Sequence, residues 1–517
     1  MFTDSKRAEA FDGIRRHDQA IFEHILIPDL FFQAARMCGL SIVGSPLNLI
    51  NLVWLAVSAA RNPKQCFADI LNLSRKTLQD HESFSGSPLA KLLEDSGPPG
   101  GKTSRHDPRK GAGEPVSEAA FSKARQRMPS EFWIALFVLL GERFLTLFPE
   151  VVRWRRFRLM AADGTEISLP DWAALRKHFG TPSNASGSHG PQARLVLLQY
   201  PLARLPRAYA LEPRAIGENT MARSLLQGLS KEDLVLLDAG FLCYGLLCQI
   251  DKQDAFFCLR LKKRLNMRQI KQLRKETGDR DVLVEWTPKD SRGQWRKERL
   301  PQSMELRLLT YHAKGFRPLQ LLTNVVSAEE VPYQEWWGLS ISEEGEVLWK
   351  GAYNLRWEIE ITYLELKVHQ GLEGGLRSRT PEGIYYEVAG HVLYYLLVRW
   401  LMVEAAQKAG VSPLRLSFTA ALEEINGQWP SAVVASRVWL EKKLRPRLLE
   451  RVGGHRVVER PGRTAPRGVK ARRAAKRALD AKFAKAAKSR RKKTPRPRPW
   501  FGRGWNLTGP LPPPTQG

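Results

Sequence analysis

Apolar residues recur at helical spacing along the N-terminal part of the chain, and runs of β-branched residues are few there. This pattern predicts an N-terminal helical domain over residues 1–94. Residues 95–116 are rich in Gly, Pro and charged residues, which is typical of a flexible linker. Beyond the linker, residues 117–156 predict a short basic helix, a break at Pro129 and a long amphipathic helix.

From residue 157 the pattern changes to short apolar runs that end in turns. RFRLMAADGTEISLPD, ARLVLLQYPL and DLVLLDAGF are predicted strands, and helical segments such as TMARSLLQGL stand between them. This alternation predicts an α/β core whose first part covers residues 157–258. Residues 259–345 predict a β-rich insertion, because strand-like runs such as DVLVEWTP and MELRLLTYHA alternate with charged turns. The second part of the core, residues 346–450, is predicted to be helical.

Two apolar stretches are long enough to be considered as membrane spans. The first, near residues 41–60, contains a proline and two asparagines, and the second, residues 384–405, contains Glu387, His391 and Arg399. Such residues are costly in lipid. We therefore predict that both stretches are core helices of a soluble protein and that no membrane is a partner.

Charge and cysteine content narrow the class of protein. The 517 residues carry a formal net charge of +28 with a pI of about 10.1, which favours a polyanionic partner, nucleic acid first. The C-terminal segment, residues 451–517, is predicted to be a basic, disordered or partly helical tail, because residues 461–500 hold 16 Lys or Arg and one acidic residue.

The chain has five cysteines and no CxxC pair, and its start is unlike a signal peptide. These features predict a cytoplasmic protein without a zinc site or disulfides.

Two aspartates follow apolar, strand-like runs and stand near glycines. Asp163 lies in RLMAADGTE, and Asp238 lies in LVLLDAGF. A carboxylate at the C-terminal end of a strand lies at the edge of the sheet, where ligands bind in open α/β folds. Asp-Gly is also a common turn pair, and for either residue alone a turn role is the simpler interpretation. As a pair in one core, the two residues are candidate metal ligands.

The segment YNLRWEIEITYLELK places one acidic residue among basic ones. At about 100° per residue, Tyr353, Arg356, Glu360 and Lys367 fall within about 60° of one another on a helix. The apolar residues beside this stripe are predicted to form the buried face: Trp357, Ile361 and Leu364. The other two acidic residues of the segment fall on the opposite flank, so helical phase singles out Glu360. The alternative is a surface helix with i,i+4 ion pairs such as Arg356–Glu360.

The spacing of these four residues resembles a family signature. Tyr353, two residues, Arg356, three residues, Glu360, six residues and Lys367 is similar to the Tyr-Arg-Glu-Lys signature of the insertion-sequence-four family of DDE transposases. The DGT turn, the LVLLDAGF run and the segment LRSRTPEGIYYEVAGHVLYYLLVRWLM also resemble that family. One departure is Ala239, where family members often carry a basic residue, and this puts one phosphate contact in doubt.

The resemblance implies a fold and a chemistry. The fold would be RNase H-like, a mixed sheet with helices interrupted by the β-rich insertion. Two Mg²⁺ ions, for which Mn²⁺ can substitute, would be held by Asp163 as the bridging ligand and by Asp238 and Glu360. The phosphates beside the scissile bond would be held by the rest of the signature: Tyr353, Arg356 and Lys367. In similar transposases these reactions cut and join double-stranded DNA at transposon ends and target.

Further DNA contacts follow from the same resemblance. A tryptophan of the insertion would stack on a flipped base, and Trp286 ranks first of four candidates because it lies in a strand-like run. The other three are Trp295, Trp336 and Trp337. Residues 119–130 are predicted either to contact DNA ends through Lys123, Arg125 and Arg127 or to form a solvated basic helix. The active form would be a homodimer that holds two transposon ends.

We therefore expect a transposase of a bacterial insertion sequence, acting in the cytoplasm at the nucleoid. Three other functions stay open at this point. The chain can be a domesticated transposase that binds DNA without cutting it, or an RNase H-like, structure-specific nuclease. A basic protein of the membrane surface is the weakest alternative.

Overall fold

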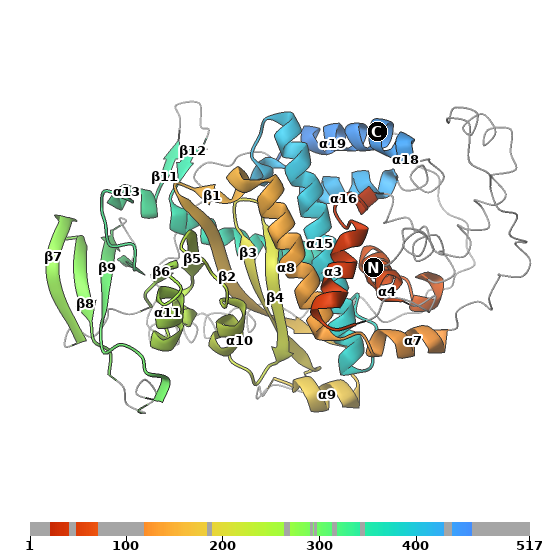
Figure 1. Cartoon of the computed structure of the whole chain (residues 1–517), viewed down its shortest axis with the longest axis horizontal. Coiled ribbons are helices and arrows are strands. Elements are labelled where there is room, and N and C mark those ends of the chain that lie inside the picture. The colour runs from red at the N-terminus through yellow and green to blue at the C-terminus, as the bar shows by residue number, and fades with distance from the viewer. Residues whose placement is uncertain are drawn as a thin grey trace, which may run out of the picture. The chain divides into compact units, whose positions relative to one another are not determined.

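A mixed β-sheet runs through the protein, and helices cover it (Figure 1). The computed structural model describes residues 21–40, 48–70, 118–182, 189–262, 269–289, 293, 297–312, 318–341, 347–428 and 437–457. Apart from residues 312 and 318, they all belong to one compact unit. The predicted linker, the predicted tail beyond residue 457 and Trp295 lie outside these residues.

The main sheet has ten strands among the described residues, in the order β4-β3-β2-β5-β6-β10-β9-β8-β7, with β1 paired to β2. Strands β2, β5 and β6 are parallel, and all other neighbours are antiparallel. The strands are β1 (Arg153–Trp154), β2 (Phe157–Ser168), β3 (Gln192–Tyr200), β4 (Leu205–Pro213), β5 (Asp233–Leu237), β6 (Phe256–Arg260), β7 (Ile270–Gly278), β8 (Asp281–Trp286), β9 (Met304–Tyr311) and β10 (Leu319–Thr323). The predicted insertion thus extends the core sheet rather than forming a sheet of its own, and only β11 (Leu339–Ile341) and β12 (Val347–Lys350) pair separately.

Helices occupy the segments before, between and after the strands. Before and within the core they are α3 (Pro28–Met37), α4 (Leu49–Arg61), α7 (Glu118–Gln126), α8 (Ser130–Leu147), η1 (Pro149–Val152), α9 (Ala173–Phe179), α10 (Glu218–Leu225), η2 (Ala239–Phe241), α11 (Tyr244–Asp251) and α13 (Tyr333–Trp336). After the insertion they are η4 (Ala352–Trp357), α14 (Glu358–Leu364), η5 (Glu365–His369), α15 (Pro381–Ala409), η6 (Pro413–Arg415), α16 (Phe418–Gly427), α18 (Arg437–Trp439), η7 (Leu440–Leu444) and α19 (Arg445–Gly454).

Helix α15 is the central helix of the fold. It begins at Thr380, whose side chain accepts a hydrogen bond from the Gly383 amide, and ends at Gly410 in the left-handed region with φ of 64°. It packs against β4, α4, α7 and α19. Within the described part of the chain, it is the one helix long and apolar enough to cross a membrane, and 94% of its most apolar window is buried in the protein. Both apolar stretches of the sequence therefore contribute core helices, α4 and α15.

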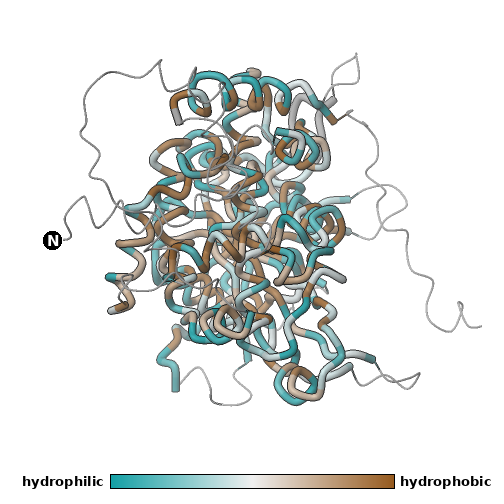
Figure 2. The backbone as a smooth tube through the Cα atoms, turned by 90° about the vertical axis from the view of Figure 1, so that its right-hand side faces the viewer, coloured by the Kyte–Doolittle hydropathy of each residue, from teal (hydrophilic) through white to brown (hydrophobic). Residues whose placement is uncertain are grey.

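Two hydrophobic cores lie on the two faces of the sheet. Alternate residues of β2 separate them: Met160 and Ala162 join the larger core with the helices, whereas Leu159 and Ala161 join the smaller core with Trp336 and its neighbours. Figure 2 shows hydrophobic and hydrophilic residues alternating along the backbone throughout the fold. The period of two in β2 decides which core each side chain enters.

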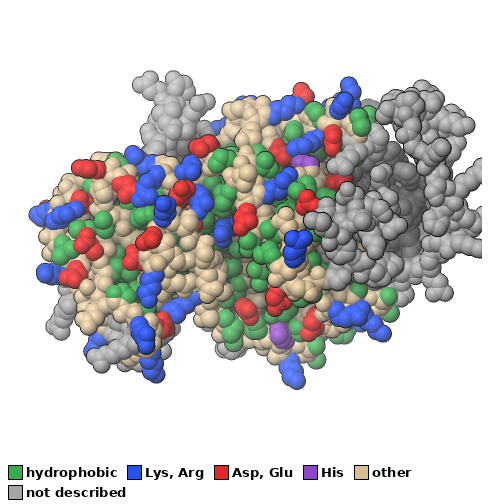
Figure 3. Space-filling model, viewed as in Figure 1, with side chains coloured by type: hydrophobic (Ala, Val, Ile, Leu, Met, Phe, Trp, Pro, Cys, Tyr) green, Lys and Arg blue, Asp and Glu red, His purple; other side chains and the backbone are tan. Residues whose placement is uncertain are grey.

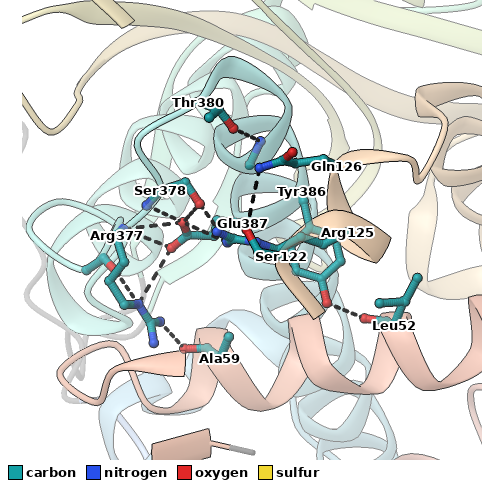
Figure 4. A network of polar contacts seen from close by, with 12 residues as sticks. Leu52, Ala59, Ser122, Arg125, Gln126, Arg377, Ser378, Thr380, Tyr386 and Glu387 are labelled. Atoms are coloured by element: carbon teal, nitrogen blue, oxygen red, sulfur yellow. Dashed lines mark hydrogen bonds and ion pairs between the residues drawn. The ribbon is translucent and has the colours of Figure 1, made fainter. Parts of the chain in front are cut away.

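A buried network around Glu387 joins α7 and α15 (Figure 4). The carboxylate of Glu387 accepts hydrogen bonds from the amides of Ser378 and Arg377, at 2.7 and 3.0 Å. Arg125 donates to the Ser378 hydroxyl at 2.7 Å and lies 3.8 Å from Glu387, while Arg377 donates to the Ala59 carbonyl of α4 at 2.7 Å. The predicted DNA contact by Arg125 is corrected here, because its guanidinium is buried and used inside the protein.

Helix α4 crosses α15 where Gly390 leaves no room for a side chain. A Cβ at position 390 would lie 2.7 Å from the carbonyl oxygen of Ala56. We expect Gly390→Ala to lower the free energy of unfolding by about 1–3 kcal/mol, because the two helices must move apart. Gly427→Ala is the matched control, since a Cβ there meets nothing within 4 Å. Urea unfolding of both variants measures the effect, and equal stability of G390A and wild type would contradict this packing.

Candidate active site

Asp163 and Asp238 lie side by side on neighbouring parallel strands. The register pairs Ala162 with Leu237, so the two aspartates occupy the next positions of β2 and β5. Parallel strands lie about 4.8 Å apart. Asp238 directly follows β5, as predicted, whereas β2 continues beyond Asp163 to Ser168, so Asp163 is not the turn residue expected from its DGT sequence.

Glu360 meets Asp163 through the guanidinium of Arg356. The Nη1 atom of Arg356 lies 3.3 Å from the Oδ2 atom of Asp163, and its Nη2 atom lies 2.9 Å from the Oε1 atom of Glu360. The i,i+4 ion pair considered as an alternative is therefore present. The same guanidinium also contacts a carboxylate on the sheet, so the helix residue and the strand residue belong to one cluster.

The surroundings of Asp163 disfavour its negative charge. Burial is the largest effect and raises the pKa of this carboxyl to about 6. A hydrogen bond from the Gly164 amide and the charge of Arg356 lower the pKa, while the carboxylates of Asp238 and Glu360 raise it. The three carboxylates are thus close enough to repel one another, with Arg356 as the partly compensating charge.

The segment that carries Glu360 is not one regular α-helix. Residues 352–357 form a 3-10 helix, α14 follows, and residues 365–369 form a π-helix. Each change of helix type shifts the angular positions expected at 100° per residue. The predicted buried face is wrong: Trp357 and Leu364 are 48% and 50% exposed, and Ile359 and Tyr363 are buried instead. All but Trp357 lie within the regular helix α14, whose other side faces the sheet through Tyr363.

Glu358 and Glu365 hold the other side of this segment to the protein. Arg204, in the turn between β3 and β4, donates to Glu358 at 2.8 Å and to Glu365 at 3.0 Å. Glu365 also accepts hydrogen bonds from Tyr395 at 2.6 Å and from Arg399, both on α15. All five side chains are buried. The prediction that these two glutamates point away from Glu360 fits this arrangement, and their structural task explains why they are acidic.

Tyr363 was not singled out from the sequence, and it ties helix α14 to strand β2, which carries Asp163. Its buried hydroxyl donates to the carbonyl oxygen of Asp163 at 2.6 Å and accepts a hydrogen bond from the Leu197 amide at 3.1 Å. Burial raises the pKa of Tyr363 well above its usual value, so the hydroxyl keeps its proton. Because the partners are backbone atoms far away in the sequence, no local pattern signals this contact.

Tyr353 and Lys367 lie beside the cluster and use their polar atoms within the protein. The Tyr353 hydroxyl donates to the carbonyl oxygen of Leu237, the residue before Asp238, at 3.1 Å, and its ring is buried. The Nζ atom of Lys367 donates to the carbonyl oxygen of Glu166 at 2.9 Å and lies 2.9 Å from the Glu373 carboxylate. In this conformation Tyr353 supports the end of β5 rather than facing a phosphate.

The structure corrects the ranking of the tryptophans. Trp286 is buried with its ring edge-to-face against Tyr244, and Trp336 is fully buried, so neither presents a ring face to a DNA base in this conformation. Trp337 is half-buried, and its ring centroid lies 5.4 Å from that of Tyr311.

Lys123 and Arg127 are exposed on or near α7, as predicted. Over the insertion, basic and acidic side chains intermingle on the surface (Figure 3).

The donor set of the site suits a hard divalent cation. Carboxylate oxygens are the ligands that Mg²⁺ and Mn²⁺ prefer. Burial raises the pKa of Asp163, and the charges of Asp238 and Glu360 raise it further. Among the residues with described positions, however, no three Asp, Glu, His or Cys side chains converge closely enough to hold an ion. The guanidinium of Arg356 lies between the carboxylates of Asp163 and Glu360. It must move aside before these two carboxylates can bind the same metal ion.

The pKa of Asp163 predicts an unusual pH dependence of stability without metal. The carboxyl titrates near pH 3.8 when unfolded and near pH 6 when folded, so its charge costs stability above pH 6. In EDTA at pH 7.5 we expect Asp163→Asn to raise the free energy of unfolding by up to about 3 kcal/mol. The difference should shrink as the pH falls through 6 towards 3.8.

Denaturant unfolding at several pH values measures this difference. Asp171→Asn is the control, because the exposed Asp171 is hydrogen-bonded to Arg176, which lowers its pKa. This control should gain no stability at pH 7.5. A D163N variant that is no more stable than wild type at that pH would show that the carboxylate of Asp163 is not disfavoured by the fold.

The part of the chain that holds the three carboxylates is similar to known transposases. Residues 154–397 match the family model described as transposase DDE domain, and this range includes all three carboxylates. The transposase InsG for insertion sequence element IS4 of Escherichia coli (strain K12) is 29% identical over 309 residues. That match covers 59% of this chain and 65% of the relative, just under two thirds of its length.

Among solved structures, a piggyBac transposase synaptic complex with hairpin DNA is similar over 88% of this chain and 86% of that chain, with 10% identity and a TM-score of 0.34. The family match and the sequence relative agree with the signature and with the carboxylate cluster. Residues 154–397 of this chain are thus similar to transposase DDE domains, and the chain is similar to a transposase of the insertion sequence element IS4.

Proposed function

We propose that this protein binds the terminal inverted repeats of a bacterial insertion sequence, cuts the DNA there and joins it to a target. The observation that carries the proposal is the cluster of Asp163, Asp238 and Glu360 around Arg356, inside a transposase DDE domain. Three carboxylates from two strands and one helix are what metal-assisted phosphoryl transfer needs.

The order of the strands supports an RNase H-like core. In β4-β3-β2-β5-β6, three antiparallel strands come first in the chain, and two parallel strands follow with helices between them. This arrangement brings Asp163 and Asp238 together at the middle of the sheet, and α14 adds Glu360 from the far side of the insertion. An RNase H-like core is the expected setting for the proposed chemistry.

Asp163, Asp238 and Glu360 would hold two Mg²⁺ or Mn²⁺ ions. When bound, such ions activate the attacking water or 3′-hydroxyl and stabilise the leaving oxygen. Arg356, once free of the carboxylates, and Lys367 are placed to contact phosphates next to the scissile bond. For Tyr353 we propose a positioning role at the end of β5 in this conformation.

The net charge of the whole chain also supports a DNA partner. The net charge of +28 attracts a polyanion, and exposed Lys123 and Arg127 are candidates for contacts to the DNA ends. Synapsis of two transposon ends requires two active sites, so we propose a homodimer bound to double-stranded DNA in the bacterial cytoplasm. A nuclease without strand transfer, or a domesticated derivative that binds without cutting, would share the fold and differ in its products.

The proposal is tested with DNA that carries the terminal repeats of the element. We expect Glu360→Gln to lower the rate of cleavage by about a thousandfold, roughly 4 kcal/mol of transition-state stabilisation, because one metal ligand is lost. Binding of the same DNA should change little. Glu150→Gln is the matched control, since Glu150 has an 83% exposed side chain outside the site.

The products separate the proposal from its alternatives. Cleaved ends with a free 3′-hydroxyl that join a target plasmid support transposition, whereas cleavage without joining supports a nuclease. DNA binding without cleavage in Mg²⁺ or Mn²⁺ indicates a domesticated protein. Full cleavage by E360Q would contradict the assignment of Glu360.

A further inference from the structure

Strand β6 ends in an arginine, Arg260, that lies level with the two aspartates of the candidate site. The register pairs Leu237 of β5 with Leu259 of β6. The residues that follow them, Asp238 and Arg260, therefore lie side by side, and Asp163 lies on the other side of Asp238. Neighbouring strands of a sheet lie about 4.8 Å apart. Asp163, Asp238 and Arg260 thus form one row across three parallel strands.

The three side chains of this row belong to the same face of the sheet. The residues two positions earlier on each strand are buried in the smaller core, namely Ala161, Leu236 and Cys258. Side chains two positions apart on a strand share a face. Asp238 keeps the extended backbone of β5, with φ of −77° and ψ of 164°. The row therefore continues the face of the smaller core at the ends of the strands.

The charge of Arg260 is not used within the described part of the protein. Its side chain is exposed. Its neighbour on the side away from Asp238 is Leu321 of β10, which is apolar and buried. Among the residues whose positions the structure describes, none accepts a hydrogen bond from Arg260 or forms an ion pair with it. The guanidinium is therefore available to a ligand that reaches this face.

The Tyr353 hydroxyl shows that Arg260 is close to the candidate site. Burial raises the pKa of this hydroxyl, the charges of Arg356 and Arg260 oppose this effect, and the charge of Asp238 adds to it. The same hydroxyl donates to the carbonyl oxygen of Leu237 at the end of β5. Two arginines thus act on one point beside Asp238, one from the segment that carries Glu360 and one from β6.

We propose that Arg260 binds a phosphate of the DNA strand that is cut, on the β6 side of the carboxylates. This inference rests on the function proposed above and adds a DNA contact to it. Ala239, the residue after Asp238, has no charge, so the next strand supplies the cation at this end of the row. A guanidinium donates two parallel hydrogen bonds to a phosphate. The alternative is a solvated arginine at the end of a strand, which would have no effect on DNA binding.

The position of Arg260 gives the bound strand a direction. Lys367, the other basic residue proposed to contact phosphate, lies 3.4 Å from the hydroxyl of Thr165. Thr165 follows Asp163 by two positions on β2 and shares its face. Arg260 lies two strands away, on β6. A DNA strand that both residues hold passes over Asp163 and Asp238 on its way from β2 to β6.

The test is binding of terminal-repeat DNA by the full chain at several salt concentrations in Mg²⁺, with Glu360→Gln in every protein so that the DNA stays uncut. We expect Arg260→Gln to reduce the slope of log Kd against log salt concentration by about 0.9, because one phosphate contact is lost. Arg260→Lys should keep most of the slope, because it keeps the charge. Arg447→Gln is the matched control, since it removes an exposed arginine of α19, outside the site.

Neutral phosphates locate the contact on the DNA. Methylphosphonates replace, one at a time, the phosphates beside the cleavage site. We expect one replacement to weaken binding severalfold when Arg260 is present and to cost nothing further in R260Q. Equal losses in both proteins at every position would overturn the contact. Denaturant unfolding checks that R260Q is folded, which we expect because the side chain is exposed.

The outcomes separate the two proposals. If the wild type cleaves terminal-repeat DNA and R260Q keeps the full salt slope, Arg260 is not a phosphate ligand and the proposed function stands. If the wild type neither prefers terminal-repeat DNA to unrelated DNA nor cleaves it, the proposed function is wrong and the contact is wrong with it. If R260Q loses both the slope and the methylphosphonate effect, Arg260 belongs to the DNA-binding surface.

Discussion

The geometry of the candidate site depends on the buried ion pairs between Arg204 and two glutamates of the segment that carries Glu360. Arg204 contacts Glu358 at the start of α14 and Glu365 at its end, so one guanidinium fixes both ends of the helix that carries Glu360. Removing one partner of such a buried pair costs about 3–5 kcal/mol, because the remaining charge stays buried. The interaction is strong because both glutamates have lost their water, and Arg399 supplies the second cation that Glu365 needs.

The segment therefore divides its acidic residues by environment. Glu358 and Glu365 have side chains that are 4% and 7% exposed and are saturated with arginine and tyrosine contacts. Glu360, with a side chain that is 34% exposed, shares only Arg356 with Asp163. The same chemical group thus forms buried structural ion pairs on one side of the helix and belongs to the partly exposed carboxylate cluster on the other.

The spacing of apolar residues in the sequence predicted those strands and helices whose formation depends on neighbouring residues alone. The strands before Asp163 and Asp238 and the core helices α4 and α15 follow from hydrophobic period and spacing. The choice of Glu360 as a site residue stays a prediction. The burial of Trp357 and Leu364 was mispredicted because both sides of α14 carry apolar residues, and contacts with distant strands decide which side is buried. The burial of Arg125 depends on Glu387, which lies more than 250 residues away in the sequence.

The register between β2 and β5 has a consequence for how this gene can vary. Successive side chains of a strand point to opposite faces, so adding or deleting a single codon in either strand would turn one aspartate into the helical core. A substitution at a neighbouring position alters the packing only slightly. A one-residue insertion or deletion in β2 or β5, in contrast, moves the side chains of Asp163 and Asp238 to opposite faces of the sheet. Length variation among functional descendants of this sequence is therefore confined to segments outside these two strands, such as the loops of the insertion.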